Sequence, residues 1–195
     1  MIKNCKGLRM KDTPATKDKR NKSMMIIRPE KIEDYGAIHK VNELAFGGRG
    51  EADLIEDLRK TDSFVPELSL VAIQNQAVIG HILFSLIVIK SKKQVIPALA
   101  LAPMAVHPEF QNKGVGSKLA VQGIEDCRRL GHRIVVVIGH PAYYPRFGFL
   151  PARDKGLQVP FPVPDEAFMV LELVPGALKA AQGQIIYPPP FQKMS

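Results

Sequence analysis

Six residues near the middle of the chain, Gln111–Gly116 with the sequence QNKGVG, have the types and spacing that bind phosphate groups. Two glycines within three residues let the main chain curl, so that successive N–H groups point into one concavity. An amphipathic helix is expected to begin at this loop, and its dipole adds positive charge at the same place. We therefore expect main-chain amides, rather than charged side chains, to bind an anion that carries several phosphates.

Two common phosphate-binding loops do not fit this spacing. A P-loop has Gly-x-x-x-x-Gly-Lys-Ser/Thr, whereas Gly116 is followed by Ser117 and only then by a lysine. A dinucleotide fingerprint has Gly-x-Gly-x-x-Gly, and Leu119 stands where its third glycine would be. The remaining pattern is Gln-x-x-Gly-x-Gly between a strand and a helix, which a plain glycine-rich turn before a helix would also produce.

A second motif, Gly139–Phe149 (GHPAYYPRFGF), follows the apolar run Ile134–Ile138, which has the character of a buried strand. Within this motif, Tyr144 stands four residues before Gly148. The two motifs, in this order and with a helix-length spacer between them, resemble the GNAT superfamily of N-acetyltransferases. The form with paired tyrosines and Arg-Phe-Gly-Phe is similar to the YhbS-like branch of that superfamily. The resemblance extends over roughly Ile26 to Phe191.

The resemblance implies an α/β (α+β) GNAT fold, with a mixed, mostly antiparallel central sheet of about seven strands, helices on both faces and splayed parallel strands that bind CoA. It implies that the protein transfers an acetyl group from acetyl-CoA to a primary amine, on a small molecule, protein or peptide, directly within a ternary complex. A catalytically weak acyl-CoA-binding sensor or regulatory module is the alternative. No metal is expected, since the five histidines show no metal-ligand spacing. The loop residues expected to bind the cosubstrate are Gln111, Asn112, Lys113, Gly114, Val115, Gly116 and Ser117.

The surrounding sequence predicts the elements that position these motifs. Apolar and β-branched runs predict strands at Ile26–Ile27, Leu68–Gln74, Ala77–Ile89, Leu99–His107, Ile134–Ile138, Phe168–Val174 and Gln184–Tyr187, with a turn at Asn75-Gln76. Helical spacing predicts helices at Lys31–Phe46, ended by Gly47, at Glu51–Lys60, and at Val115–Leu130, with Leu119, Ile124, Cys127 and Leu130 facing inward. The order of strand, helix and strand around the phosphate loop predicts a right-handed βαβ crossover. This crossover puts the loop at the carboxyl end of its first strand, where open sheets bind ligands.

Pro103 lies inside one of these strands, although proline cannot donate to the hydrogen-bond ladder. A bulge near Pro103 would reconcile the proline with a central strand, while a strand that ends early is the alternative. In GNAT proteins the corresponding strand carries a bulge and splays from its parallel partner. The resemblance therefore implies that pantetheine enters this gap and hydrogen-bonds to the main chain of Met104, Ala105 and Val106. A freed N–H there would polarise the thioester carbonyl.

Acetyl transfer to an amine needs two proton transfers. An amine with a pKa near 10.4 must be deprotonated, at a cost of about 4 kcal/mol at neutral pH, and the departing thiolate gains from a proton. Tyr144 matches the family's tyrosine and is the expected proton donor, with Tyr143 as a contact of the cosubstrate. In the alternative arrangement, Tyr144 packs in the core and Tyr143 faces the ligand.

The base is left open by the sequence. Glu51 lies in the region that lines the acceptor site in GNAT proteins, and a solvated carboxylate at a helix start is the alternative interpretation. His140 is a second candidate, as a proton relay or as a donor to a main-chain carbonyl, whereas His81 is expected to be a hydrogen-bonded core residue. The segments Phe46–Phe64 and Val159–Asp165 are expected to determine acceptor specificity.

Composition is ordinary for a folded protein, with 46% hydrophobic and 24% charged residues. The net charge of +8 is concentrated before Met24, where eight Lys or Arg stand against two Asp, which leaves +2 for residues 24–195. We therefore expect a basic, disordered tail at 1–23 and one GNAT domain at 24–195. Nucleic-acid binding is not expected, because no aromatic residues alternate with the lysines of the tail. Without a bilayer-length apolar run, a secretory signal or a disulfide framework, we expect no membrane association and a cytoplasmic monomer or homodimer.

Overall fold

The computed structural model describes residues 24–91 and 94–194, so the expected basic tail lies outside the described residues. The described residues form nine strands in a single sheet. These are β1 (Ile26–Pro29), β2 (Phe64–Gln74), β3 (Ala77–Lys90), β4 (Val95–Val106), β5 (Ile134–Ile138), β6 (Leu150–Pro151), β7 (Leu157–Gln158), β8 (Phe168–Glu172) and β9 (Gly183–Ile186). The α-helices in the same residues are α1 (Tyr35–Phe46), α2 (Gly50–Leu58) and α3 (Val115–Arg129), and none of them is long and apolar enough to cross a bilayer.

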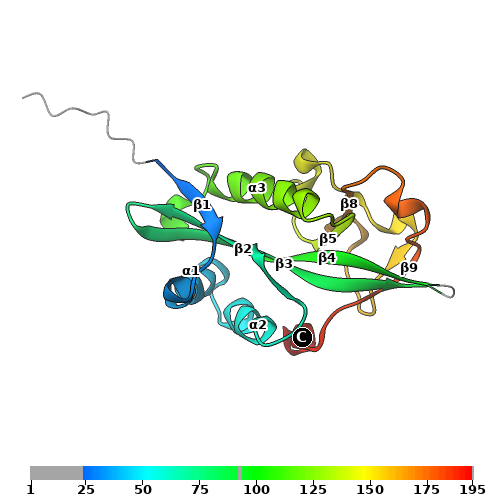
Figure 1. Cartoon of the computed structure of the whole chain (residues 1–195), viewed down its shortest axis with the longest axis horizontal. Coiled ribbons are helices and arrows are strands. Elements are labelled where there is room, and N and C mark those ends of the chain that lie inside the picture. Colours follow the sequence, from blue (N-terminus) through cyan, green and yellow to red (C-terminus); the bar gives the residue numbers. More distant parts are fainter. Residues whose placement is uncertain (1–23, 92–93, 195) are drawn as a thin grey trace, which may run out of the picture.

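The sheet is mixed and mostly antiparallel. Its strands follow the order β1-β2-β3-β4-β5-β8-β6, with β9 paired to both β3 and β7. Strands β4 and β5 are parallel neighbours joined through α3, which is the expected crossover. Figure 1 shows α3 on one face of the sheet and α1 and α2 on the other. The expected fold is confirmed, and it includes two further strands of two residues each, β6 and β7.

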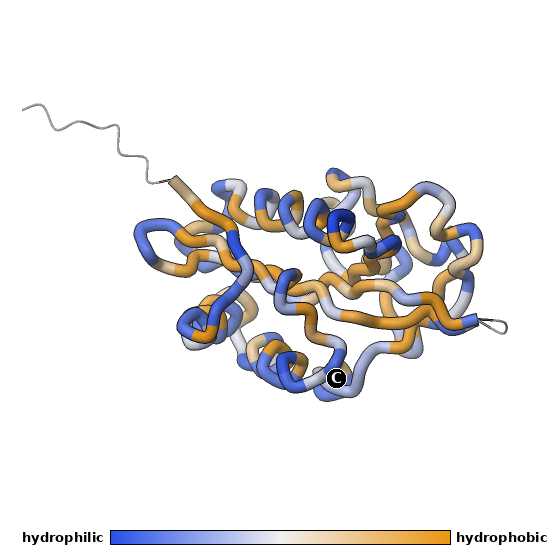
Figure 2. Tube along the Cα trace, viewed as in Figure 1, coloured by the Kyte–Doolittle hydropathy of each residue, from blue (hydrophilic) through white to orange (hydrophobic). Residues whose placement is uncertain are grey.

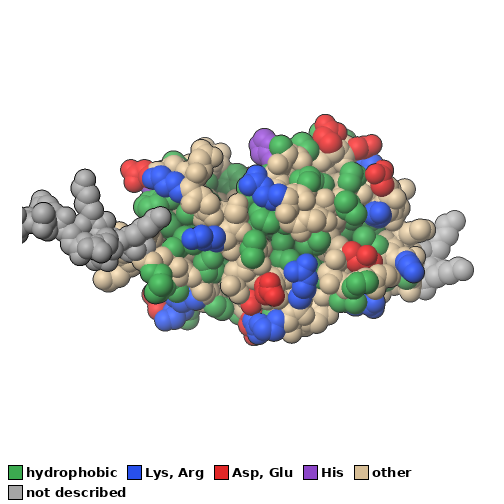
Figure 3. Space-filling model, turned by 90° about the horizontal axis from the view of Figure 1, so that it is seen from above, with side chains coloured by type: hydrophobic (Ala, Val, Ile, Leu, Met, Phe, Trp, Pro, Cys, Tyr) green, Lys and Arg blue, Asp and Glu red, His purple; other side chains and the backbone are tan. Residues whose placement is uncertain are grey.

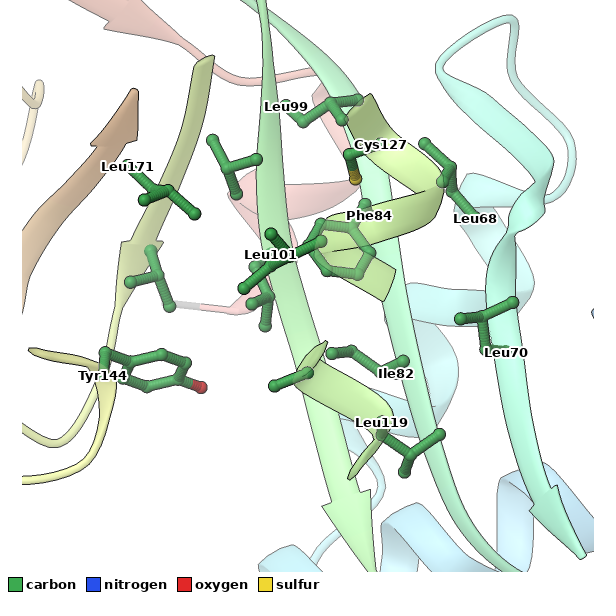
Figure 4. Close-up of a cluster of buried hydrophobic side chains, with 14 of the residues drawn as sticks. Leu68, Leu70, Ile82, Phe84, Leu99, Leu101, Leu119, Cys127, Tyr144 and Leu171 are labelled. Atoms are coloured by element: carbon green, nitrogen blue, oxygen red, sulfur yellow. The ribbon is translucent and has the colours of Figure 1, made fainter. Parts of the chain in front are cut away.

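Strand β3 is buried on both of its faces, which explains its nearly continuous apolar sequence. Phe84 belongs to the apolar cluster shared with α3, together with Leu119, and Figure 4 shows this cluster. Leu83 points to the other face and packs in a cluster with Ile38 of α1. Figure 2 shows the same distribution along the chain, with hydrophobic residues following the central strands and hydrophilic residues on the loops and outer helix surfaces.

Helix α3 lies close to the sheet at positions that only glycine permits. A Cβ atom at Gly123 would lie 2.4 Å from the Phe84 ring, and one at Gly80 would lie 3.0 Å from Leu119 Cδ1. Three of the four residues expected to face inward from this helix are buried, but Leu130 is 38% exposed. Leu130 is the C-cap, where the chain has already left the helix. These contacts fix α3, and with it the loop before its first turn.

Turns occur where the sequence predicts them. Asn75 and Gln76 have φ values of 51° and 64° and close the hairpin between β2 and β3, and Gly47 has a φ of 72° at the end of α1. Helix α1 begins at Tyr35 rather than at Lys31, because a short 3-10 turn fills the first residues of the predicted helix.

Strand β4 carries the expected bulge at Pro103. Ile82 of β3 pairs with Met104, but Phe84 pairs with Leu101, so two residue steps on β3 match three on β4. The extra residue falls in the Ala102-Pro103 segment. Proline's missing N–H therefore lies at an irregularity in the ladder, and the strand continues beyond it.

Strands β4 and β5 separate next to this bulge. Their last pair in register is Ala100 with Val136, although β4 continues to Val106 and β5 to Ile138. Each strand keeps its other neighbour, because β3 pairs with β4 up to Val106 and β8 pairs with β5 up to Ile138. The parallel pair is therefore splayed, as the resemblance implies.

A buried polar group ties α2 to the sheet, and we call it the Glu30 cluster. The Glu30 carboxylate accepts two hydrogen bonds from the Arg59 guanidinium, at 2.7 and 2.9 Å, and one from Ser69 Oγ at 2.6 Å. His81, fully buried, lies 2.9 Å from Ser69 Oγ through its Nε2 atom. Burial by itself raises the pKa of Glu30, but hydrogen bonds from His81, Arg59 and Ser69 lower it to about 2. Because Arg59 directly follows α2, the cluster fixes the end of that helix.

Candidate active site

A cavity of about 420 Å³ lies where β4 and β5 separate. The splayed strands form one side of it, and the end of α1 with the start of α2 forms the other. Its lining residues are Phe46, Glu51, Leu54, Leu101, Ala102, Pro103, Met104, Ile138, Gly139, His140, Tyr143 and Tyr144. Glu51, Met104, Tyr143 and Tyr144, which the sequence places in catalysis or cosubstrate binding, therefore come together around one space.

The phosphate loop has the curled main chain that its glycines predict. Asn112 and Gly114 have φ values of 59° and 82°, and Gly114 is the N-cap of α3. The first main-chain bond of the helix runs from the Lys118 amide to the Gly114 carbonyl at 3.1 Å. The amides from Val115 to Ser117 come before that bond and have no partner within the helix. They are available to an anion at the positive end of the helix dipole.

The long side chains of this loop bind its own main chain. Gln111 Nε2 donates to the Val106 carbonyl at 3.1 Å, and Lys113 Nζ donates to the Glu109 carbonyl at 2.7 Å. The first bond ties the loop to the end of β4, and the second ties it to the 3-10 turn Pro108–Phe110 that follows β4. An anion in the loop is therefore left mainly to the backbone amides, which agrees with the interpretation from the sequence.

The free edge of β4 presents main-chain groups to the gap. The His107 amide donates to the Ile79 carbonyl of β3 at 2.9 Å. Because backbone groups point alternately to the two sides of a strand, the amides of Val106 and Met104 face the opposite edge, where β5 no longer pairs. Ala105 lies between them with its side chain buried. The main chain expected to meet pantetheine is thus free of strand pairing on that side.

Tyr144 lies in the wall of the cavity and is 8% exposed. Its ring packs edge-to-face against Phe149 at 5.6 Å, and it lies so close to Gly139 that a Cβ there would be 2.3 Å from the ring. Figure 4 shows its hydroxyl directed toward β4, the strand that carries Leu101. Burial, with a smaller effect of Tyr143, raises the pKa of Tyr144 above its ordinary value of 10.0, so the phenol keeps its proton. The hydroxyl is a donor placed at the gap.

Tyr143 reaches the phosphate loop from the other side of the gap. A Cβ atom at Gly116 would lie 2.9 Å from the Tyr143 hydroxyl, so the phenol touches the first turn of α3. The Arg146 guanidinium stacks on the Tyr143 ring at 4.2 Å, and its Nε donates to the Tyr143 carbonyl at 2.9 Å. Arg146 therefore holds the turn that orients Tyr143. The two tyrosines point to different parts of the site, Tyr143 to the loop and Tyr144 to β4.

Glu51 is the candidate base that the structure places in the cavity wall together with His140. It stands in the first turn of α2, where the helix N-terminus stabilises a carboxylate. Among residues 24–91 and 94–194, no side chain forms an ion pair or hydrogen bond with it. His81 is not in this cavity and belongs to the Glu30 cluster, as expected for a core histidine.

Several lining residues carry no signal of their own in the sequence. Leu54, Leu101 and Ile138 are apolar residues at positions that fit any amphipathic helix or buried strand, and only the splay of β4 and β5 turns them into cavity walls. Of the two segments expected to set acceptor specificity, Phe46–Phe64 contributes three lining residues, whereas none of the described lining residues comes from Val159–Asp165.

Outside the cavity, one cluster within residues 24–91 and 94–194 has metal-ligand residue types. Ligand atoms of His39, Asp53 and Glu56 lie within 4.8 Å of one another. His39 Nδ1 already bonds Glu56 Oε1 at 2.8 Å, and this contact joins α1 to α2. Figure 3 shows that Lys and Arg side chains on the α3 face are scattered among apolar and acidic ones and do not form one basic surface.

Known proteins share this arrangement. Residues 26–152 match the family described as "Acetyltransferase (GNAT) domain". The chain is 44% identical to the uncharacterized N-acetyltransferase YjhQ of Escherichia coli strain K12 over 134 residues, which cover 68% of this chain and 74% of the relative. It is 32% identical to the uncharacterized N-acetyltransferase YhbS of the same strain over 170 residues, which cover 87% of this chain and 99% of the relative.

Solved structures are similar over most of the chain. The crystal structure of YhbS from Escherichia coli in complex with CoA superposes with a TM-score of 0.80 at 29% identity, covering 87% of this chain and 93% of that one. A GNAT family acetyltransferase from Brucella melitensis in complex with acetyl-CoA superposes with a TM-score of 0.70 at 30% identity, covering 87% and 99%. The family match spans more than half of the chain and includes the phosphate loop, the splayed strands and both tyrosines. The chain therefore belongs to the GNAT family of acetyltransferases.

Proposed function

We propose that this protein transfers the acetyl group of acetyl-CoA to a primary amine, directly and within a ternary complex. The observation that carries the proposal is the continuity of the site. The amide loop at the start of α3, the unpaired edge of β4 and the cavity wall with Tyr144 and Glu51 follow one another along the gap between β4 and β5. A molecule with phosphates at one end and a thioester at the other fits these three surfaces in the order in which they lie along the gap.

The residues of the loop fit the phosphate end of acetyl-CoA. Unpaired amides and a helix N-terminus bind anions without a charged side chain. Gly116 leaves room for the Tyr143 hydroxyl beside the loop, since a Cβ there would lie 2.9 Å from that oxygen. The relatives crystallised with CoA and acetyl-CoA support the same assignment for this chain.

Acetyl-CoA supplies the acetyl group as a thioester. The chain's own residues hold and move the protons. Tyr144, like any phenol, is protonated at neutral pH, burial raises its pKa further, and in this proposal it gives its proton to the sulfur that leaves. In this proposal Glu51, in the cavity wall, accepts a proton from the incoming ammonium, and the Met104 and Val106 amides, which have no partner on β5, donate to the thioester carbonyl.

A covalent acetyl-enzyme is not part of the proposal. Cys127 is the one cysteine among the described residues, and it faces the core from α3 with no exposed surface. Burial raises the pKa of its thiol to about 12, so it is not a nucleophile. Direct attack by the amine remains the simplest route.

The test is the variant Tyr144→Phe, which keeps the ring and its contacts and removes only the hydroxyl. We expect turnover, measured as release of free thiol, to fall about tenfold or more, while acetyl-CoA affinity measured by calorimetry stays the same. The matched control is Tyr187→Phe, because Tyr187 is a partly buried phenol whose ring packs at a tilt against Phe191 at 5.0 Å, outside the cavity. Unchanged turnover in Tyr144→Phe would remove Tyr144 from the mechanism. Acetyl-CoA binding without turnover of any amine would favour an acyl-CoA sensor.

We also propose that residues 24–195 form one domain, which the continuous sheet from β1 to β9 supports. A cytoplasmic location and a monomeric or homodimeric state stay predictions from the sequence.

A further inference from the structure

We propose that the acceptor is a small monoamine whose single ammonium group is attached to an apolar, ring-sized body. The inference rests on the proposed acetyl transfer and names its substrate class. It comes from the part of the cavity that the thioester arm leaves open, which is the side formed by α1 and α2.

The residues that line the cavity come from two parts of the fold. Leu101–Met104 of β4, and Gly139, His140, Tyr143 and Tyr144 after β5, border the gap that the thioester arm is proposed to occupy. Phe46, Glu51 and Leu54 face it from α1 and α2. The whole cavity of about 420 Å³ is at the small end of the range for ligand sites, roughly 300–1,000 Å³. Because a cavity of this size also has to hold the acetyl end of the cosubstrate, we infer an acceptor body no larger than about one ring.

Apolar groups dominate this acceptor side. Leu54 is 3% exposed and forms a floor, whereas Phe46 is 46% exposed although it lines the cavity. Ile138, at the end of β5, is 39% exposed at the same cavity. A ligand that covers Phe46 and Ile138 removes apolar surface from water, and an apolar ligand body is favoured there for the same reason.

Charge limits the acceptor to one ammonium group. Glu51 is the only acidic residue among the described residues that line the cavity. The next acid on the same helix, Asp53, lies outside it and pairs with Arg49 at 3.9 Å. A polycation would bring charges that find no second carboxylate in these walls, and each unpaired charge costs free energy on desolvation. Apolar walls also lower the pKa of a bound ammonium, which favours the neutral amine that must attack.

The reaction of such an amine balances with the groups at hand. The nitrogen lone pair forms the new C–N bond to the acetyl carbon, and the C–S bond breaks with its electron pair on sulfur. Sulfur takes a proton from Tyr144 and leaves as the thiol. Before the attack the ammonium gives one proton to Glu51, which passes it to solvent. After the C–N bond has formed, the nitrogen loses its second proton by the same route, and Tyr144 regains its proton from solvent, so that one proton is released for each thiol formed.

The test compares kcat/KM, from free-thiol release, for 2-phenylethylamine, ethylamine, spermidine and kanamycin. We expect 2-phenylethylamine to exceed ethylamine about tenfold or more, because only its ring reaches the apolar walls, and to exceed both polycations. Phe46→Ala is expected to reduce the phenylethylamine-to-ethylamine ratio about fivefold or more, and Phe46→Leu to reduce it less. Leu44→Ala is the matched control, because Leu44 is 40% exposed on the same helix and does not line the cavity.

The Glu51 step has its own pair of variants. Glu51→Gln is expected to lower kcat/KM for 2-phenylethylamine about a hundredfold and to weaken its pH dependence, while Asp53→Asn leaves both unchanged. Far-UV circular dichroism and acetyl-CoA affinity verify that each variant is folded. If Phe46→Ala is not folded, Phe46→Leu is used for the comparison. A higher kcat/KM for spermidine or kanamycin than for 2-phenylethylamine would overturn the inference while leaving acetyl transfer intact. A phenylethylamine-to-ethylamine ratio in Phe46→Ala equal to that of the wild type would do the same. Acetyl-CoA binding with no turnover of any of the four amines would overturn the proposed function as well.

Discussion

The substitution Glu30→Gln tests how the fold holds α2, the helix that carries Glu51, against the sheet. Glu30 and Arg59 are paired by two short hydrogen bonds, with side chains only 3% and 9% exposed. The Arg59 guanidinium also stacks over the Tyr35 ring at 3.7 Å, so it cannot move into solvent without losing that contact. Glutamine keeps the shape of the side chain and removes its charge. Arg59 would then be a buried cation without a counter-ion.

The expected loss of stability follows from that burial. Removing one partner of a buried ion pair costs about 3–5 kcal/mol, because the remaining charge keeps its desolvation penalty. An exposed pair contributes about 0–1 kcal/mol. In a domain of this size each kcal/mol lowers the melting temperature by roughly 2–4 °C, so Glu30→Gln is expected to lower it by about 10 °C. Replacing both residues, as in Glu30→Gln with Arg59→Met, should cost less than Glu30→Gln alone, since no unpaired charge remains.

Thermal and urea unfolding followed by circular dichroism measure both effects. Glu43→Gln is the control, because Glu43 pairs with Lys40 on the exposed side of α1, and it should unfold like the wild type. A Glu30→Gln variant that melts with the wild type would mean that the pair contributes nothing net. A double variant less stable than Glu30→Gln would mean that the unpaired charge is not the main penalty. Either result would refute the stabilising role of the Glu30 cluster.

Three further predictions concern stability and cosubstrate binding. Burial lowers the pKa of His81 below its ordinary 6.5, so below that pH the unfolded chain binds a proton that the folded chain does not. The free energy of unfolding should therefore be highest above about pH 6.5 and fall below it by up to about 1.4 kcal/mol per pH unit. His81→Gln should reduce that slope, measured by urea unfolding at a series of pH values. Gly116→Ala should weaken acetyl-CoA binding about tenfold in calorimetry, because the added methyl group displaces the Tyr143 hydroxyl and enters the amide loop. Gly123→Ala should destabilise the fold in urea unfolding, since overpacking against Phe84 costs about 1–3 kcal/mol and the gain in helix propensity is at most about 1 kcal/mol.

The sequence predicts the elements whose periodicity is strong. Ile134–Ile138 matches β5 at both ends, because an apolar, β-branched run at the sheet centre has no other stable place. The beginning of β4 at Val95 is missed by four residues, since Pro97 argues against a strand there. Pro97 nevertheless lies opposite Val88 in the ladder, where pairing with the long strand β3 extends beyond the local preference. Strands β6 and β7 have two residues each, too few for any period.

The candidate site is predictable where it is made of backbone. The spacing of Gly114 and Gly116 encodes a main-chain conformation directly, so the loop could be inferred from residue types alone. The directions of Tyr143 and Tyr144 could not, because adjacent residues at the start of a short 3-10 turn diverge according to local geometry. The Glu30 cluster joins residues 29 and 39 positions apart, and no local pattern signals such a pairing.

The splay of β4 and β5 is stable because neither strand depends on the other along the gap. Strand β4 is paired with β3 as far as Val106, and β5 is paired with β8 as far as Ile138, so each keeps one complete ladder. The bulge at Pro103 falls just after the last β4–β5 pair, at Ala100, where one added residue changes the register for the rest of the strand. Proline is normally confined to edge strands and bulges, and Pro103 of the central strand β4 lies where β4 and β5 separate. Beyond that pair the Met104 and Val106 amides point away from β3 with no partner on β5, and the proposed acetyl transfer uses them as donors to the thioester carbonyl.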